Sequence, residues 1–202
     1  PADGGVYFRV ASATWDGSLP HEIGKARLIA EKTSHATAAF TAMAAIHARL
    51  LAKQRPARAA TVLAAARHAW QFLQTHPQWP AEGERYHHPK GINAGEYPDP
   101  SAQDYILWAA AELYRSTGEA GFHDAYLERV GQVKIDPTGV VSFKDQGMAA
   151  HWAYLMAPWP NKDATRVKRA RDIFLAAADW RIRKMQQHPY HAPVHQYRGY
   201  LG

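Results

Sequence analysis

The feature that most constrains the fold of this chain is a pair of helical segments joined by a very short link. Residues 34–53 place apolar side chains at helical spacing, and residues 56–75 do the same after Pro56, a residue that suits the first turn of a helix. Only Gln54 and Arg55 separate the two segments. Such a short link forces the two helices to fold back on each other as an antiparallel hairpin.

The same arrangement is predicted twice more along the chain. Ser101 and Asn161 suit the N-caps of two later helices, and Gly118 suits the end of the helix that Ser101 begins. The two further helix pairs cover residues 101–116 with 120–130, and residues 144–156 with 161–187. The long loops that follow the pairs are rich in aromatic residues and proline, and they cover residues 76–100, 131–143 and 188–202.

This pattern predicts an all-α protein built from antiparallel helical hairpins. Such hairpins either close into an α/α toroid or stack as a solenoid. A strand or short β-hairpin is predicted at residues 4–13, ahead of the helices, because apolar and polar residues alternate there. Long loops in compact domains are more often functional than idle, so we expect a binding or catalytic site in the loops.

Composition narrows the class of protein. Hydrophobic residues make up 47% of the 202 residues and charged residues 21%, which is typical of a globular domain. The absence of cysteine excludes disulfides and thiolate metal sites. No stretch of 18 apolar residues predicts a transmembrane helix. The first residues lack the pattern of a signal peptide, so we expect the chain to begin within the fold.

The net charge of +6 raises the question of a nucleic-acid partner. Much of the charge lies in residues 166–171 and 181–184, where basic residues alternate at helical spacing with Ile173, Phe174 and Trp180. This pattern favours the solvated face of one amphipathic helix. Neither a nucleic acid nor a membrane is expected as a partner.

Several segments together resemble the family nine glycoside hydrolases, the group that holds many cellulases. The most specific are Asp-Gly-Gly-Val-Tyr at residues 3–7, Ala-Ala-Arg-His-Ala-Trp-Gln-Phe-Leu at 65–73, and Trp-Ala-Ala-Ala-Glu-Leu-Tyr at 108–114. They occur in the family's order, and the likeness spans nearly the whole chain. One departure is Tyr105, which stands where the family usually has Glu.

The resemblance implies a six-hairpin α/α toroid, of which residues 1–202 supply about half. They are then a partial catalytic domain whose N-terminal and C-terminal parts are missing. The implied reaction is hydrolysis of a β-1,4-glucan with inversion, by a general acid and a base-activated water. The family's catalytic base lies upstream of the matched segments and its acid downstream. The resemblance therefore assigns no catalytic residue to this chain, and the isolated chain is predicted to be inactive.

The resemblance also implies a substrate groove formed by the loops. Tyr97 lies in a loop that carries sugar-stacking aromatics in the family, and Phe143 stands where the family usually has Trp. Asp99 either lines the cleft or closes an Asx turn, and Asp145 either binds a sugar hydroxyl or caps the following helix. The predicted substrate-binding residues are Trp15, His21, Tyr97, Asp99, Phe143 and Asp145.

Two other groups of residues have structural explanations. Asp104 is expected to stabilise a helix N-terminus. The histidines of the C-terminal loop, His191 and His195, would share a helical face, but Pro193 breaks that helix. No metal and no cofactor are therefore expected.

Three hypotheses about the function remain open at this point. The first is a cellulase-type enzyme, secreted or periplasmic, completed by the missing parts of the same domain or by self-association. The second is an exo-acting relative that trims gluco- or glucosamine oligosaccharides. The third is a non-catalytic α/α carbohydrate-binding or scaffold protein.

Overall fold

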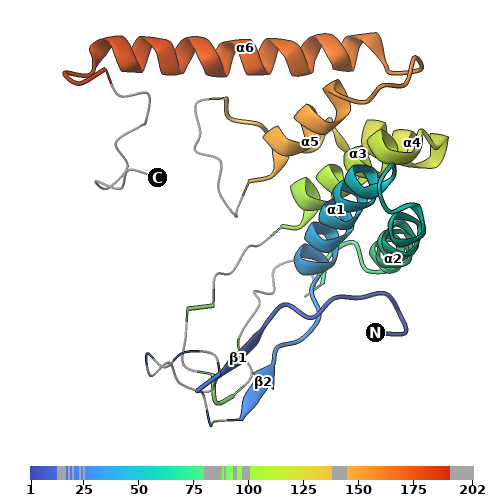
Figure 1. The fold of residues 1–202 in the computed structure, drawn as a ribbon. Coiled ribbons are helices and arrows are strands. Elements are labelled where there is room, and N and C mark those ends of the chain that lie inside the picture. The colour runs from blue at the N-terminus through green and yellow to red at the C-terminus, as the bar shows by residue number, and fades with distance from the viewer. Residues whose placement is uncertain are drawn as a thin grey trace.

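The structure of the chain is a computed structural model, and its described residues confirm an all-α architecture with one small sheet (Figure 1). The helices are α1 (Ser34–Leu51), α2 (Pro56–Thr75), α3 (Gln103–Thr117), α4 (Ala120–Arg129), α5 (Gly147–Leu155) and α6 (Ala164–Gln187), and the strands are β1 (Val10–Ser12) and β2 (Arg27–Ile29). The described residues are 1–12, 17, 19, 21–22, 24, 26–79, 88, 90–92, 95–96, 101–137 and 145–191. No helix among these residues is long and apolar enough to cross a membrane.

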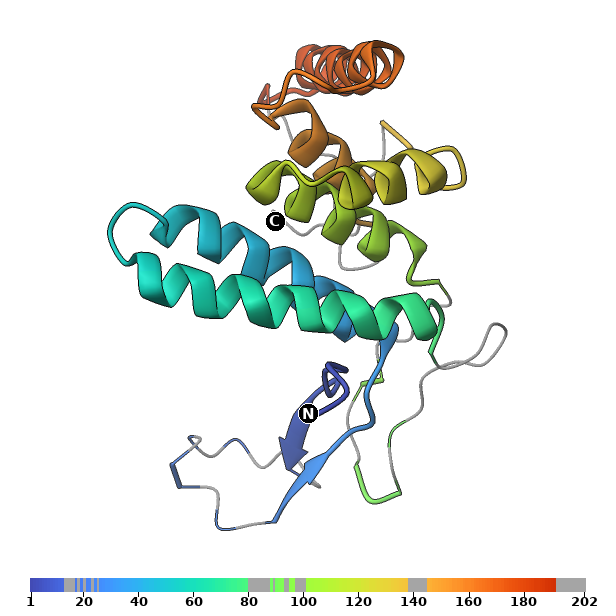
Figure 2. The same ribbon diagram turned by 90° about the vertical axis from the view of Figure 1, so that its right-hand side faces the viewer.

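The α1–α2 pair is the hairpin that the short link predicted. Figure 2 shows it from the side, with its tight turn at the left. The Thr33 hydroxyl caps α1 by accepting a hydrogen bond from the Ala36 amide, and Pro56 opens α2. Small side chains such as Ala42, Ala45 and Ala66 are fully buried, which lets the helices approach closely.

Helix α3 is the centre of the core, because it packs against both α1 and α5 and also contacts α4. Eight of its 15 residues are buried. The turn into α4 consists of Gly118 and Glu119, and Gly118 adopts a left-handed φ of 75°. The Trp159 ring covers this turn so closely that a Cβ at position 118 would lie 2.9 Å from its Cε2 atom.

A stack of aromatic rings fills the space between α3, α4 and α5. Tyr154 stacks on Tyr126 with 4.1 Å between ring centroids, and His123 stacks on Tyr114 at 4.7 Å. The Tyr154 hydroxyl meets His123 Nε2 at 2.9 Å and accepts a hydrogen bond from the Asp163 amide at 2.7 Å. The buried hydroxyl therefore has the partners that burial of a polar group requires.

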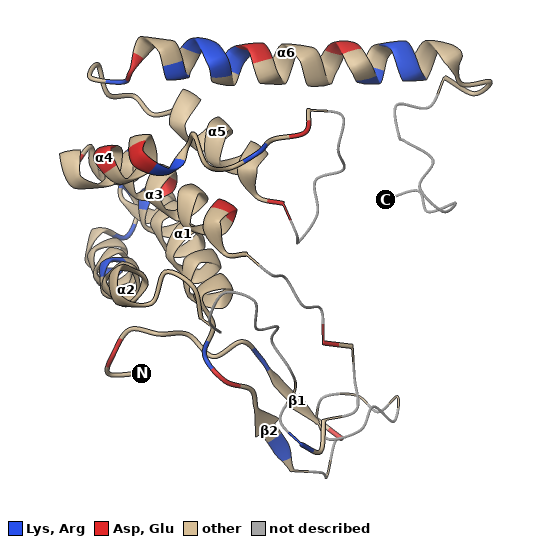
Figure 3. Cartoon of the chain, turned by 180° about the vertical axis from the view of Figure 1, so that it is seen from behind, with Lys and Arg blue, Asp and Glu red and all other residues tan. Residues whose placement is uncertain are grey.

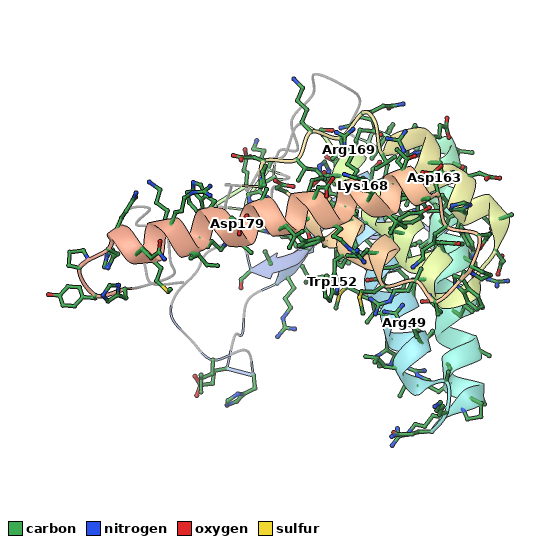
Figure 4. The ribbon with its side chains drawn as sticks, turned by 90° about the horizontal axis from the view of Figure 1, so that it is seen from above. Arg49, Trp152, Asp163, Lys168, Arg169 and Asp179 are labelled. Atoms are coloured by element: carbon green, nitrogen blue, oxygen red, sulfur yellow. The ribbon has the colours of Figure 1, made fainter. Side chains whose placement is uncertain are left out.

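Among the described helices, α6 is the longest and has the smallest share of buried residues. It lies across one edge of the molecule, next to α5 (Figure 1). Only Ala170 and Ala177 are buried among its 24 residues. Basic and acidic residues are distributed along it (Figure 3). Viewed from above, its second half, which carries Asp179, extends beyond the helices packed under its first half (Figure 4).

The small sheet confirms the strand that was predicted near the N-terminus and gives it a partner that the sequence did not predict. Strand β1 lies within the predicted range 4–13, but its antiparallel partner is β2, with Val10 opposite Ile29. The sequence had assigned no strand to residues 27–29. The pairing extends to an isolated bridge between Tyr7 and Lys32.

Two predicted helix caps differ from those in the structure. Ala102 rather than Ser101 precedes α3, and Asp163 rather than Asn161 caps α6 by accepting a hydrogen bond from the Arg166 amide. The Asn161 side chain instead accepts a hydrogen bond from the Tyr114 hydroxyl at 2.7 Å. Its role is to join the α5–α6 connection to the core.

Candidate functional site

The starts of α1, α3 and α5 lie together at one end of the helices. His35 Nε2, in the first turn of α1, lies 2.8 Å from the Ser101 carbonyl oxygen, just before α3. Asp104 Oδ2, in the first turn of α3, accepts a hydrogen bond of 2.6 Å from the Gln146 amide, just before α5. The three helices therefore run in the same direction. We refer to the end at which they start as the loop end.

The opposite end is fixed by a partly buried ion pair. Near the end of α1, Arg49 donates to Glu112 Oε2 at 2.9 Å and to the Ser116 hydroxyl at 2.6 Å, both on α3. Arg115 lies 3.9 Å from the other Glu112 oxygen. Burial and the neighbouring Arg49 lower the pKa of Arg115, while Glu112 opposes this effect. These contacts hold α1 and α3 in register.

Further contacts bring α2 and the small sheet to the loop end. The Ser34 hydroxyl donates to the His76 carbonyl at 2.7 Å, and the Gln78 side-chain oxygen accepts from the Ala102 amide at 3.1 Å. Arg9, next to β1, donates to the Gly95 carbonyl at 2.9 Å. The described parts of the loop between α2 and α3 and of the loop before α5 therefore both meet this end.

Two of the predicted substrate-binding residues are described. His21 is exposed in the connection between β1 and β2, with its Nε2 atom 3.8 Å from Glu22 Oε1. Asp145 Oδ1 accepts a hydrogen bond of 3.0 Å from the Gly147 amide and so stabilises the start of α5. Trp15, Tyr97, Asp99 and Phe143 lie outside the described residues.

Three carboxylates at or near the loop end accept hydrogen bonds from backbone amides. Besides Asp104 and Asp145, Glu96 Oε1 accepts from the His88 amide at 2.9 Å. These contacts fix the backbone around the loops. Within the part of the chain that the structure describes, no three His, Asp or Glu side chains are grouped as metal ligands.

The marked pKa shifts of tyrosine and histidine lie in the aromatic core. Burial and, to a smaller extent, nearby Arg169 and Arg166 lower the pKa of His151 to about 4. Burial raises the pKa of Tyr154 to about 12 and that of Tyr126 above its usual range. Since these groups pack between helices, we attribute their shifts to core packing.

Sequence reasoning missed two residues at the loop end. His35 joins the starts of α1 and α3, and Trp79 lies just beyond α2 with an exposed ring. Trp79 could have been found as an aromatic residue that follows a helix directly and opens a long loop. No sequence signal pairs His35 with Ser101, because 66 residues separate them.

The hairpins and their common loop end define a segment of an α/α-toroid protein. The family model described as "Glycosyl hydrolase family 9" matches residues 2–199. The chain belongs to this family.

Individual relatives agree with this assignment. The chain is 27% identical over 188 residues to Endoglucanase D of Acetivibrio thermocellus, covering 93% of this chain and 29% of the relative. It is 27% identical to a xyloglucan-specific endo-beta-1,4-glucanase of Bacteroides ovatus, covering 96% of this chain and 34% of the relative. The chain thus spans about a third of the length of these curated relatives.

Solved structures show the same fold. The crystal structure of the family 9 endoglucanase J30 matches with a TM-score of 0.83 and 28% identity, over 96% of this chain and 35% of that one. The structure of AaCel9A in complex with cellobiose-like isofagomine matches with a TM-score of 0.84 and 25% identity, over 96% of this chain and 36% of that one.

Proposed function

We propose that residues 1–202 are part of the catalytic domain of a cellulase-type enzyme that hydrolyses β-1,4-glucan with inversion. The observation that carries the proposal is the family match over residues 2–199, in a chain whose loops meet at one end of parallel helices. This chain supplies part of the floor and wall of the substrate groove. The catalytic acid and base are proposed to lie in parts of the domain outside it.

In this proposal the predicted substrate-binding residues act at the loop end. Tyr97 and Asp99 lie in the segment that leads to Ser101, which His35 holds against α1. Phe143 and Asp145 lie in the segment that leads to α5, which Asp104 holds against α3. Aromatic rings would stack on sugar rings, and polar side chains would bind their hydroxyl groups.

The chemistry needs two carboxyl groups about 6.5–9.5 Å apart, with a water between one of them and the sugar. Asp104 and Asp145 are each bonded to a backbone amide, which suits a structural role. Their contacts therefore favour a catalytic pair located elsewhere in the domain.

The test measures reducing ends released from a soluble cellulose derivative. The 202-residue chain is expected to release none, and the chain extended by its flanking coding sequence is expected to release them. The extended chain should first yield the α-anomer in proton NMR. If the short chain is active after repurification and Asp99→Asn abolishes that activity, the proposal that the catalytic residues lie outside this chain is wrong.

The exo-acting alternative has one observation in its favour. The chain is also 29% identical over 214 residues to a cellulose 1,4-beta-cellobiosidase of Acetivibrio thermocellus. Viscosity separates the two actions, because internal cleavage lowers the viscosity of a polymer early. Loss of viscosity that only follows the release of sugar would favour the exo-acting alternative.

We further propose that an apolar ridge on α1 packs against more helices of the same domain. Phe40, Met43 and Leu50 are exposed at helical spacing along α1. Exposed apolar patches of this kind commonly mark interfaces. The alternative is that a second copy of the chain covers this ridge. Sedimentation of the chain with and without Met43→Glu distinguishes the two, since only self-association predicts oligomers that the substitution disperses.

The family assignment and the lack of a spanning helix among the described residues are compatible with a secreted or periplasmic enzyme, which we propose as its location. Fractionation of cells that produce the full protein tests this location.

A further inference from the structure

Trp79 is an exposed aromatic side chain at the loop end. Trp79 is 45% exposed, whereas Trp70, which lies within α2, is 8% exposed. A single exposed apolar residue needs no functional explanation by itself. The case for Trp79 depends on how firmly the residue is held and on what lies beside it.

The Trp79 ring is held by neighbouring rings and by the backbone. Phe72 stacks on His76 with 4.3 Å between centroids and 7° between planes, and His76 meets Trp79 edge to face at 5.9 Å. The Trp79 carbonyl accepts a hydrogen bond of 2.9 Å from the Ser34 amide. A side chain that is already ordered loses little conformational freedom when a ligand binds to it.

The position of Trp79 relates it to the proposed groove. Its neighbour Gln78 accepts a hydrogen bond from the Ala102 amide at 3.1 Å, while Trp79 itself contacts the start of α1. Ala102 follows Ser101, the residue that ends the segment carrying Tyr97 and Asp99. Residues 78 and 79 thus lie between the starts of α1 and α3, next to Ala102, which follows the segment that is proposed to bind substrate.

We propose that Trp79 is an additional sugar-stacking residue at the rim of the groove and takes a glucose ring of a β-1,4-linked chain. This inference rests on the proposed function, because it assigns the ligand as a β-glucan. A pyranose ring presents C–H groups on its faces, and a fixed indole offers it an apolar surface with one N–H at the edge.

The chain offers a closely matched control in Trp152. Trp152 is 48% exposed and also meets one aromatic neighbour edge to face, Phe174, at 5.6 Å. It lies in α5 beside α6, where Figure 4 labels it. Replacing each tryptophan by alanine therefore removes a similar exposed ring from two different places.

The experiment measures binding of cellohexaose by isothermal titration calorimetry to the 202-residue chain and its variants. Aromatic contacts of this kind correspond to a loss of affinity of about twofold to tenfold. Trp79→Ala should show that loss, Trp79→Phe should retain most of the affinity, and Trp152→Ala should bind like the unchanged chain. Thermal unfolding of each variant verifies that the fold is retained.

The outcomes separate this inference from the proposed function. If the unchanged chain binds and Trp79→Ala binds equally well, the assignment of Trp79 is wrong and the proposed function stands. If the unchanged chain binds no β-1,4-glucan oligosaccharide, the assignment of Trp79 is overturned, while the proposed function is decided separately by the release of reducing ends from the extended chain. Equal losses in Trp79→Ala, Trp79→Phe and Trp152→Ala would show a general effect on folding and would also overturn the assignment.

Discussion

Helices α3 and α6 differ in how much of their surface is buried. Eight of the 15 residues of α3 are buried, whereas α6 buries two of 24. Helix α3 has neighbours on several sides, and its alanines allow those neighbours to approach. Helix α6 contacts α5 through its first half and exposes Leu175 and Ile182. The extent of burial, more than helix length, therefore determines where a substitution destabilises the fold.

The largest expected effect concerns the aromatic core. Tyr154→Ala should lower the free energy of unfolding by about 4 kcal/mol, because it empties a fully buried site and leaves the Asp163 amide without its acceptor. Leu175→Ala on α6 should change it by less than about 0.5 kcal/mol. Urea unfolding followed by circular dichroism measures both. Similar losses in the two variants would contradict the contrast between the helices.

The next effect concerns the partly buried ion pair between α1 and α3. Arg49→Met should cost about 3 kcal/mol, because the Glu112 side chain is 5% exposed and would lose its closest cation. Arg171→Met, at an exposed position on α6, is the matched control and should be close to neutral. The same urea titrations apply. A neutral Arg49→Met would mean that Arg115 alone compensates the charge.

A third effect depends on pH. His151 has a pKa of about 4 in the folded chain, against 6.5 when exposed, so the unfolded chain binds more protons between these values. Stability should therefore fall by roughly 2–3 kcal/mol as the pH falls from 6.5 to 4. His151→Gln should flatten this part of the profile. An unchanged slope in that variant would assign the acid sensitivity to other groups.

The smallest effect concerns the exposed face of the second half of α6. Ile182→Gln should alter the melting temperature by no more than about 2 °C, since the side chain is already half exposed. A drop larger than about 5 °C would show that this half of α6 is buried in solution. Sedimentation would then identify whether a second copy of the chain covers it.

The sequence predicted the helices well because their signals are local. Apolar spacing, Pro56 and Gly118 gave the hairpins with bounds close to those observed. The pairing of β1 with β2 was missed because each strand has only three residues and polar neighbours. Asn161 resembled a cap in the sequence, but its partner, Tyr114, lies 47 residues away and could not be identified without the fold.

The candidate site was predicted only in outline, for the same reason. Loop composition and family resemblance indicated which segments matter, and the structure brings the starts of α3 and α5 together through Asp104 and Gln146. That contact joins residues 42 positions apart. The roles of Tyr97, Asp99, Phe143 and Trp15 stay predictions, and so do the sugar contacts of His21 and Asp145.

The covered turn at Gly118 has a consequence for how such a protein can vary. Because the Trp159 ring leaves no room for even a Cβ there, and its indole N–H donates to the Tyr114 carbonyl at 2.7 Å, this connection tolerates neither insertion nor most replacements. New sequence can be accommodated much more readily in the long connections at the opposite end. Evolution and laboratory selection are thereby directed to a single end of the helices, where a longer loop leaves the scaffold intact and, under the proposed function, would change ligand preference.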